Sequence, residues 1–226
     1  MRSQEAVVSS TGRKVFREEI RNAIREAIFA EELRPGDRII ETYWAKELGV
    51  SQGPVREAIR DLEALGLVET VPFKGSRVRL LSKKDIQDNY SVRICLESKS
   101  IRDAITMLTD DQLNVLTEQL SEILKEMDDC AGRGDLRAFT DSDTAFHRAI
   151  IVATENQVLL KLWEQCNMRN WFHVSALTDA ASLKQLQSGH QRIFTAIRAK
   201  NVEEATTTLE YHLTSLMEGF MRAENL

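Results

Sequence analysis

Residues 45–59, with the sequence AKELGVSQGPVREAI, constrain the fold more than any other stretch because they describe two short helices joined by a tight turn. Gly49 lies where the chain must adopt a positive φ. Ser51 is placed to cap the second helix by accepting a backbone N–H, and Pro54 falls in the first turn, where its missing N–H is tolerated. This pattern predicts a helix-turn-helix, although a corner between two core helices is an alternative.

The second helix of this pair is predicted to be amphipathic. Val55, Ile59 and Leu62 recur at the spacing of one helical face, which would pack against the protein. The opposite face is polar and partly cationic, as a helix that enters a DNA major groove requires. The candidate DNA-contacting residues of this helix are Ser51, Gln52, Gly53, Arg56 and Arg60.

Two β-rich segments, residues 66–71 and 77–80, flank the turn sequence PFKGS and predict a β-hairpin. A hairpin directly after a recognition helix is a wing. Lys74, Gly75 and Arg77 near its tip are predicted to reach a phosphate or the minor groove. A plain surface hairpin is the alternative.

Three motifs in this region, LRPGDRI, AKELGVSQGPVREAIRDLEALGLVE and FKGSRV, resemble the winged-helix head of GntR-type bacterial transcription regulators. The resemblance covers residues 15–80 in order and implies binding to double-stranded DNA. The chain departs from the family at Gln52-Gly53, where Arg-Thr or a similar pair commonly follows the capping serine. Gln52 can still bind adenine through its amide, but it brings no positive charge to a guanine or a phosphate.

The length of 226 residues suits two domains, and their charges differ. Residues 1–80 carry a net charge of +1, whereas residues 81–226 carry −6. This asymmetry permits a DNA-contacting head on an acidic body. The expected organisation is a disordered arm over residues 1–12, a winged helix-turn-helix domain over 13–81 and an all-helical domain over 82–226.

Several kinds of protein are disfavoured by the composition. No apolar run approaches the ~18 residues of a membrane span. The N-terminus lacks the apolar core of a signal peptide, so we expect a cytoplasmic protein without a membrane partner. Cys95, Cys130 and Cys166 are widely spaced without a CxxC motif, which argues against a disulfide framework or a cysteine-rich zinc site.

Outside the wing the chain is predicted to be mostly α. A helix is expected over residues 15–33, and from Ser82 onward apolar residues recur at helical spacing with short breaks. Short connections between successive helices predict an antiparallel bundle. Its expected helices cover residues 83–107, 110–130, 135–153, 157–177, 180–199 and 202–222.

Four polar residues lie on helix faces that should be apolar in such a bundle. Asp143 and His147 are four residues apart and thus lie above one another on one helix face. His190 and His212 lie 11 residues before and after the break at Asn201, at the same height of an antiparallel hairpin. One carboxylate and three imidazoles suit a divalent ion, zinc first, with nickel or manganese as alternatives. Satisfied core histidines are the metal-free alternative.

His173 also lies near an apolar stripe and is an alternative ligand on spacing alone. The polar motifs follow in the order R-x3-E from Arg93, D-x3-H from Asp143 and then two single histidines. This order resembles the FCD ligand-binding domain found on one large branch of the GntR group. That resemblance implies an all-α bundle, frequently with a metal held by one Asp and three His. It selects the four residues of the preceding paragraph and leaves His173 out.

A metal in a cavity has open coordination positions, which favour a small anionic effector, typically a carboxylate. Arg93 is the predicted anchor for the other end of the effector, because a guanidinium binds a carboxylate bidentately. Alternatively, Arg93 pairs with Glu97 one turn on. Arg169, from a later helix, is the second candidate anchor.

These features predict an effector-responsive transcription regulator that binds a palindromic operator as a homodimer, and the family resemblance implies that it is a repressor. A regulator that senses the metal directly and a purely structural metal are alternatives. A metallohydrolase is a further alternative, since the same four residues could activate a water. It is disfavoured because no second acid or base stands at helical spacing beside them, and the head would have no purpose.

Overall fold

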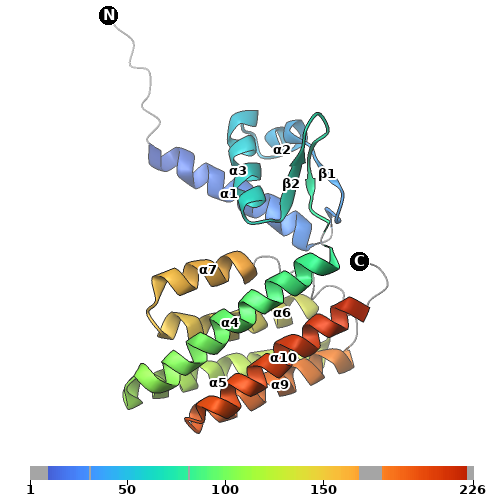
Figure 1. Ribbon diagram of the computed structural model, residues 1–226. Coiled ribbons are helices and arrows are strands. Elements are labelled where there is room, and N and C mark those ends of the chain that lie inside the picture. Colours follow the sequence, from blue (N-terminus) through green and yellow to red (C-terminus); the bar gives the residue numbers. More distant parts are fainter. Residues whose placement is uncertain (1–9, 31, 81, 168–179, 223–226) are drawn as a thin grey trace, which may run out of the picture. The chain divides into compact units, whose positions relative to one another are not determined.

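The structure is a computed structural model of the chain and describes residues 10–30, 32–80, 82–167 and 180–222. It divides into two compact units, Met1–Leu80 and Leu81–Leu226. Figure 1 shows the helices and strands of both units. Within the described ranges, no helix is both long enough and apolar enough to span a membrane.

The first unit combines helices with a three-stranded antiparallel sheet. Its elements are α1 (Ser10–Phe29), β1 (Arg38–Ile39), α2 (Glu41–Glu47), α3 (Gln52–Ala64), β2 (Val68–Val71) and β3 (Gly75–Val78). The strand order is β1-β3-β2, and β2 and β3 form the hairpin that the sequence predicts. The first helix begins inside the segment 1–12 that was expected to be disordered, and residues 1–9 lie outside the described part of the chain.

The helix-turn-helix is present, and α3 buries the predicted face. Val55, Ile59 and Leu62 are buried, and Gly49 adopts a φ of 65° in the turn between α2 and α3. Ser51 is the N-cap residue of α3, but its side chain forms no capping hydrogen bond, so that prediction is wrong. The cause lies in Pro54, which occupies the third position of the helix and has no N–H to donate to the serine hydroxyl.

The second unit is a helical bundle, which makes the chain mostly α as predicted. Its helices are α4 (Lys83–Met107), α5 (Asp110–Arg133), α6 (Leu136–Ala153), α7 (Gln157–Asn167), α9 (Ala180–Arg198) and α10 (Val202–Arg222). Capping boxes at Ser82 and Thr109 begin α4 and α5, and Gly134 ends α5 in the left-handed conformation. The predicted helix over 157–177 extends past α7 into residues 168–179, which lie outside the described residues.

The core of the bundle lies between α4, α5, α6, α9 and α10 and includes Phe146, Ile193 and Leu209. A group of polar side chains is buried together with these apolar residues. It contains Arg93 and Glu97 of α4, Asp143 and His147 of α6, His190 of α9 and His212 of α10.

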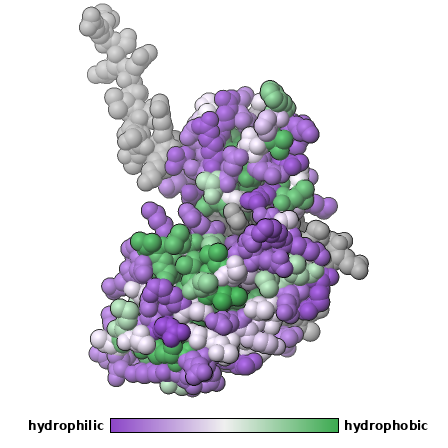
Figure 2. Space-filling model, in the orientation of Figure 1, coloured by the Kyte–Doolittle hydropathy of each residue, from purple (hydrophilic) through white to green (hydrophobic). Residues whose placement is uncertain are grey.

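An apolar area lies on the surface over α7 and the adjoining part of α4 (Figure 2). Val158 and Leu162 of α7 are 70% and 47% exposed, and Val92 of α4 is 45% exposed. Contiguous apolar surface on a folded protein commonly marks an interface with another protein.

Candidate metal centre and nucleic-acid interface

The structure brings the four predicted metal ligands together in the core of the bundle. Asp143, His147, His190 and His212 are all buried, and one ligand atom from each lies within 4.8 Å of the others. His190 Nε2 lies 3.0 Å from Asp143 Oδ1 and 3.2 Å from His147 Nε2. The ring of His212 packs against both other imidazoles, with centroids 4.3 Å from His190 and 5.8 Å from His147.

The outer nitrogens of two of these rings face acceptors. Nδ1 of His190 lies 2.9 Å from the backbone carbonyl oxygen of Leu186, and Nδ1 of His147 lies 2.7 Å from Oε2 of Glu97. An acceptor so close favours the ring proton on Nδ1, although the contact of His147 with Glu97 is not a well-aligned hydrogen bond. In the neutral ring this leaves a lone pair on Nε2. Metal-bound histidines typically donate their other nitrogen in this way.

Lone pairs therefore converge between α6, α9 and α10. With neutral rings, Nε2 of His147, Nε2 of His190 and Oδ1 of Asp143 are all acceptors, so none can hydrogen-bond to another. Nε2 of His212 is buried without a hydrogen-bond partner among the described residues. A buried polar atom left without a partner costs about 1–3 kcal/mol. A divalent cation would remove this cost, and the residues fit the nitrogen and oxygen ligands that zinc takes.

The charges of the four residues suit the same role. Burial opposes the ionisation of Asp143, but the contact with His190 and the nearby His147 outweigh burial and hold the pKa of Asp143 below its usual range. Burial, together with the neighbouring imidazoles, lowers the pKa of His212 well below its usual value. At neutral pH the site thus contains a carboxylate and a neutral third imidazole, the forms that bind a metal.

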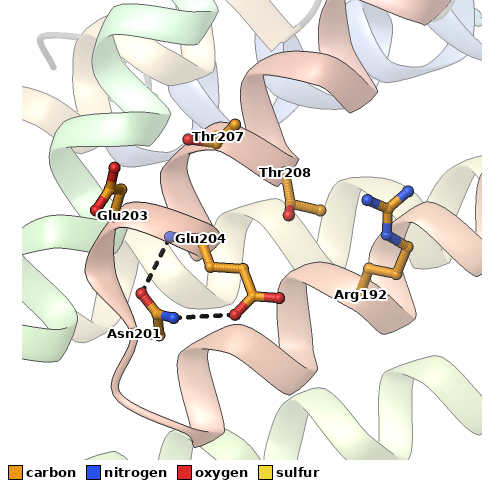
Figure 3. Close-up of a pocket in the computed structure, with 6 residues that line it drawn as sticks. All are labelled: Arg192, Asn201, Glu203, Glu204, Thr207 and Thr208. Atoms are coloured by element: carbon orange, nitrogen blue, oxygen red, sulfur yellow. Dashed lines mark hydrogen bonds between the residues drawn. The ribbon is translucent and has the colours of Figure 1, made fainter.

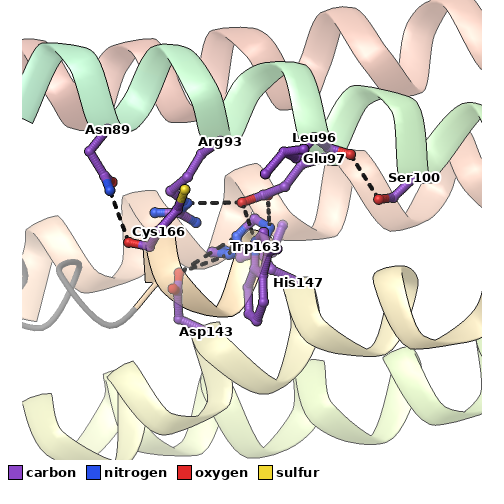
Figure 4. A network of polar contacts seen from close by, with 10 residues as sticks. Asn89, Arg93, Leu96, Glu97, Ser100, Asp143, His147, Trp163 and Cys166 are labelled. Carbon is purple, nitrogen blue, oxygen red and sulfur yellow. Dashed lines mark hydrogen bonds and ion pairs between the residues drawn. The ribbon is translucent and has the colours of Figure 1, made fainter. Parts of the chain in front are cut away.

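Glu97 orients His147 and is itself fixed by two donors. Its Oε1 accepts from Nε of Arg93 at 2.9 Å and from the indole N–H of Trp163 at 2.8 Å, as Figure 4 shows. Burial opposes the ionisation of Glu97, but the positive charge of Arg93 and the contact with His147 outweigh it and lower its pKa to about 2. Glu97 is therefore a charged acceptor at neutral pH that keeps the His147 ring in place.

Arg93, the predicted effector anchor, forms the pair with Glu97 that was its alternative role. Its guanidinium is fully buried, yet Nη1 has no hydrogen-bond partner in the described part of the chain. Nη1 is therefore free to donate to a ligand, while Nε binds Glu97. Arg169 and His173 lie outside the described residues.

Gly189 provides the space that the His212 ring occupies. A Cβ on Gly189 would lie 2.6 Å from Nδ1 of His212, closer than real atoms approach. Glycine in a helix interior costs about 0.5–1 kcal/mol relative to alanine, so its place in α9 beside His190 indicates a packing requirement. Sequence reasoning missed Gly189 and Trp163, although a glycine inside a helical pattern was a usable signal.

Gly189→Ala is expected to weaken zinc binding by about 10–100-fold, the usual cost of disturbing the surroundings of a metal ligand. The added methyl must displace the His212 ring from the other three ligands. Gly219→Ala in α10 is the matched control, because a Cβ there meets nothing within 4 Å. Zinc affinity is measured by competition with a chromophoric chelator, and equal affinities of the two variants would rule out this role of Gly189.

The predicted DNA-contacting side chains of α3 are exposed on the face opposite the buried one. Arg56 donates to Glu41 at 2.7 Å and to Gln52 at 3.3 Å, and Arg60 donates to Glu57 at 2.9 Å. Exposed ion pairs of this kind contribute little to stability, so both guanidinium groups can exchange a carboxylate for a phosphate at small cost.

The remaining candidates lie at the start of α3 and on the wing. Ser51 and Gly53 are exposed, and a Cβ on Gly53 would approach only the Ser51 hydroxyl, at 4.0 Å. Lys74 and Gly75 are exposed at the turn of the hairpin. Arg77 instead lies along β3, 2.6 Å from Glu69 of β2, so it is engaged within the sheet.

Known protein families match both units. The family model described as bacterial regulatory proteins, gntR family, matches residues 16–78, and the FCD domain model matches residues 88–215. A probable D-xylose utilization operon transcriptional repressor of Paenarthrobacter nicotinovorans is 29% identical, with 93% of this chain and 92% of the relative covered. The HTH-type regulator YdhC of Bacillus subtilis, named as uncharacterized, is 31% identical over 81% of each chain.

A solved structure supports the same fold. The structure of McbR/YncC from E. coli superposes with a TM-score of 0.79 at 22% identity and covers 93% of this chain and 99% of its own. The two family models match in the same order as the two units of the structure. The gntR model covers the helix-turn-helix with its wing, and the FCD model covers the helical bundle. The chain therefore belongs to the GntR family of bacterial transcription regulators, in the group that carries an FCD domain.

Proposed function

We propose that this member of the family is an effector-responsive repressor that acts in the cytoplasm and binds a palindromic operator as a homodimer. The observation that carries the proposal is the exposed polar face of α3, which lies opposite a fully packed face and is followed directly by the wing. Relatives named as repressors support repression rather than activation. The exposed apolar area of Val92, Val158 and Leu162 supports contact with a second copy.

The start of α3 would read the operator in the major groove. The amide of Gln52 can bind adenine bidentately, and the exposed Ser51 hydroxyl and Gly53 backbone suit a phosphate near the helix N-terminus. Arg56 follows one turn along α3. Lys74 at the wing would contact the flanking backbone, and such contacts position the protein without selecting a sequence.

Selection from a random pool of duplex DNA is expected to return a short palindrome. Gln52→Ala should then lose about 1–3 kcal/mol of discrimination at one base pair of each half-site. Lys74→Ala should weaken binding to all sequences and reduce the slope of log affinity against log salt by about 1 for each contact. Both variants are measured by fluorescence anisotropy over a series of salt concentrations.

The control for these variants is Lys99→Ala, which removes an exposed lysine of α4 in the second unit. It should leave operator affinity unchanged. Failure of the wild type to enrich any sequence would overturn the proposed function, whereas enrichment without an effect of Gln52→Ala would overturn only the role of that residue.

We further propose that a divalent ion, zinc first and nickel or manganese next, is held by Asp143, His147, His190 and His212. When bound, an ion that takes a fifth or sixth ligand would offer an open coordination position to an oxygen ligand. The converging lone pairs support this assignment, and the unpartnered Nη1 of Arg93 supports a small carboxylate as effector. Arg169 remains a second candidate anchor.

Effector binding would change operator affinity by favouring one of two arrangements of the dimer, which requires a difference in effector affinity between them. If the protein instead senses the metal directly, chelation alone would abolish operator binding, with no organic effector needed. A metallohydrolase is not proposed, because the relatives with assigned roles are transcription regulators.

A further inference from the structure

The outer nitrogen of His212 differs from those of the other two histidines of the site. Nδ1 of His147 faces Glu97, and Nδ1 of His190 faces the carbonyl oxygen of Leu186. His212 forms no hydrogen bond to any residue in the described ranges, and its Nε2 is buried in the core. The bundle thus supplies an acceptor for two of the three rings and leaves the third without one.

His212 lines the floor of a groove between α9 and α10 with a volume of about 510 Å³. Gly189 opens this floor, because the point where its Cβ would stand is 2.6 Å from Nδ1. A side chain at this position would cover Nδ1, so glycine leaves that nitrogen accessible. Because His212 lines the groove and only its Nε2 is fully buried without a partner, an acceptor that enters the groove beside Gly189 can approach Nδ1.

The walls of the groove carry positive charge and donors. Arg192 makes no ion pair with a residue that the structure describes, and Arg222 lies 3.8 Å from Glu218. The hydroxyls of Ser215 and Tyr211 add two further donors. This lining suits a negatively charged oxygen ligand, since only Glu218 opposes one.

A second pocket adjoins the groove at Arg192 and Thr208 (Figure 3). Two carboxylates line this pocket, Glu203 and Glu204, and Glu204 accepts from the side chain of Asn201 at 3.0 Å. The backbone N–H of Glu204 in turn donates to the Asn201 side chain at 3.2 Å, so the two residues cap the N-terminus of α10. Arg192 lines both pockets and forms no ion pair with either carboxylate among the described residues.

We propose that the α9–α10 groove binds a small oxyanion, a carboxylate or a phosphate, that accepts the Nδ1–H of His212 and is balanced by Arg192. The inference rests on the metal site proposed above, because ligation through Nε2 is what fixes the proton on Nδ1. An acceptor on the outer nitrogen makes an imidazole a stronger ligand. A bound oxyanion therefore raises the affinity for the metal, and a bound metal raises the affinity for the oxyanion by the same factor. The groove lies on α9 and α10, separate from the proposed effector anchor Arg93 on α4.

The test uses the full-length, zinc-loaded protein, titrated in separate arms with acetate, with inorganic phosphate and with chloride as an ionic-strength control. Long-range ¹H–¹⁵N spectra of the histidine rings report the His212 Nδ1–H. We expect one oxyanion, and not chloride, to shift that signal and to raise zinc affinity about fivefold or more. The arm that responds identifies the source of the oxyanion.

Two variants make the result specific. Arg192→Gln is expected to weaken the response at least tenfold, whereas Arg198→Gln should not change it, since Arg198 lies on the same helix against Phe194. Zinc binding without an oxyanion-dependent change at His212, or a response that Arg192→Gln leaves intact, overturns the groove alone. If the wild type takes up no zinc, the proposed metal site fails and this inference fails with it.

Discussion

Replacing both Asp143 and His190 by alanine is expected to reduce the metal content from about one ion per chain to none, because zinc sites in proteins have at least three protein ligands and only two would remain. Metal present at about a thousandfold its Kd adds about 4 kcal/mol to stability. At about 2–4 °C per kcal/mol for a protein of this size, a chelator should lower the wild-type Tm by about 10 °C and leave the variant unaffected. Elemental analysis and thermal melts measure both effects.

Ser100→Ala/Thr206→Ala is the matched control, since it also truncates two buried polar side chains of the bundle. Their hydroxyls donate only to carbonyl oxygens of their own helices, at 2.8 Å and 2.9 Å. This variant should keep its metal. A carboxylate that raises only the wild-type Tm would place the effector at the metal. A wild type that takes up no metal would reduce the four residues to a polar core or a metal-free pocket, while the DNA-binding proposal would stand.

Glu97→Gln is expected to destabilise the second unit by about 3–5 kcal/mol, because it leaves the buried Arg93 guanidinium without its charge partner. Both side chains are almost completely buried, at 1% and 3% exposure, so water cannot compensate. Urea unfolding of both proteins measures the difference in the free energy of unfolding. Glu164→Gln is the control: it removes a carboxylate that pairs with Arg148 at the surface and should cost less than about 1 kcal/mol.

The same variant should change the acid sensitivity of the protein. The pKa of Glu97 is lowered from its usual value of 4.5 to about 2 in the folded state, so its charge stabilises the folded state above pH 4.5. That contribution is lost as the pH falls from about 4.5 towards 2, since the unfolded state then binds the proton first. Glu97→Gln should lack this component. Equal losses of stability in wild type and variant over that range would contradict the assignment.

Local chemistry made the helix boundaries predictable. Ser82 and Thr109 begin helices, and Gly134 ends one, through bonds and torsions that involve only neighbouring residues. The exception, the capping bond of Ser51, fails for an equally local reason, the proline at the third position. The position of Arg77 was less predictable, because pairing with Glu69 across the hairpin depends on the register of the two strands.

The four candidate ligands were predictable because polar side chains on apolar stripes must point inward together. Their surroundings were not. The indole of Trp163 reaches Glu97 from α7, and the contact of Gly189 with His212 depends on how closely α9 and α10 approach. Periodicity assigns a residue to a helix face, but it specifies neither the rotation of that helix nor its distance from the next one.

The carboxylate partners of Arg56 and Arg60 bear on how this regulator finds its operator. Residues 1–80 carry a net charge of only +1. Two cations of the recognition helix α3, Arg56 and Arg60, are already paired with Glu41 and Glu57. Since affinity for bulk chromosomal DNA comes almost entirely from unneutralised cations, little of the cellular pool should be sequestered there. A small number of copies would then suffice to occupy the operator, and most of them would remain available to respond to the proposed effector.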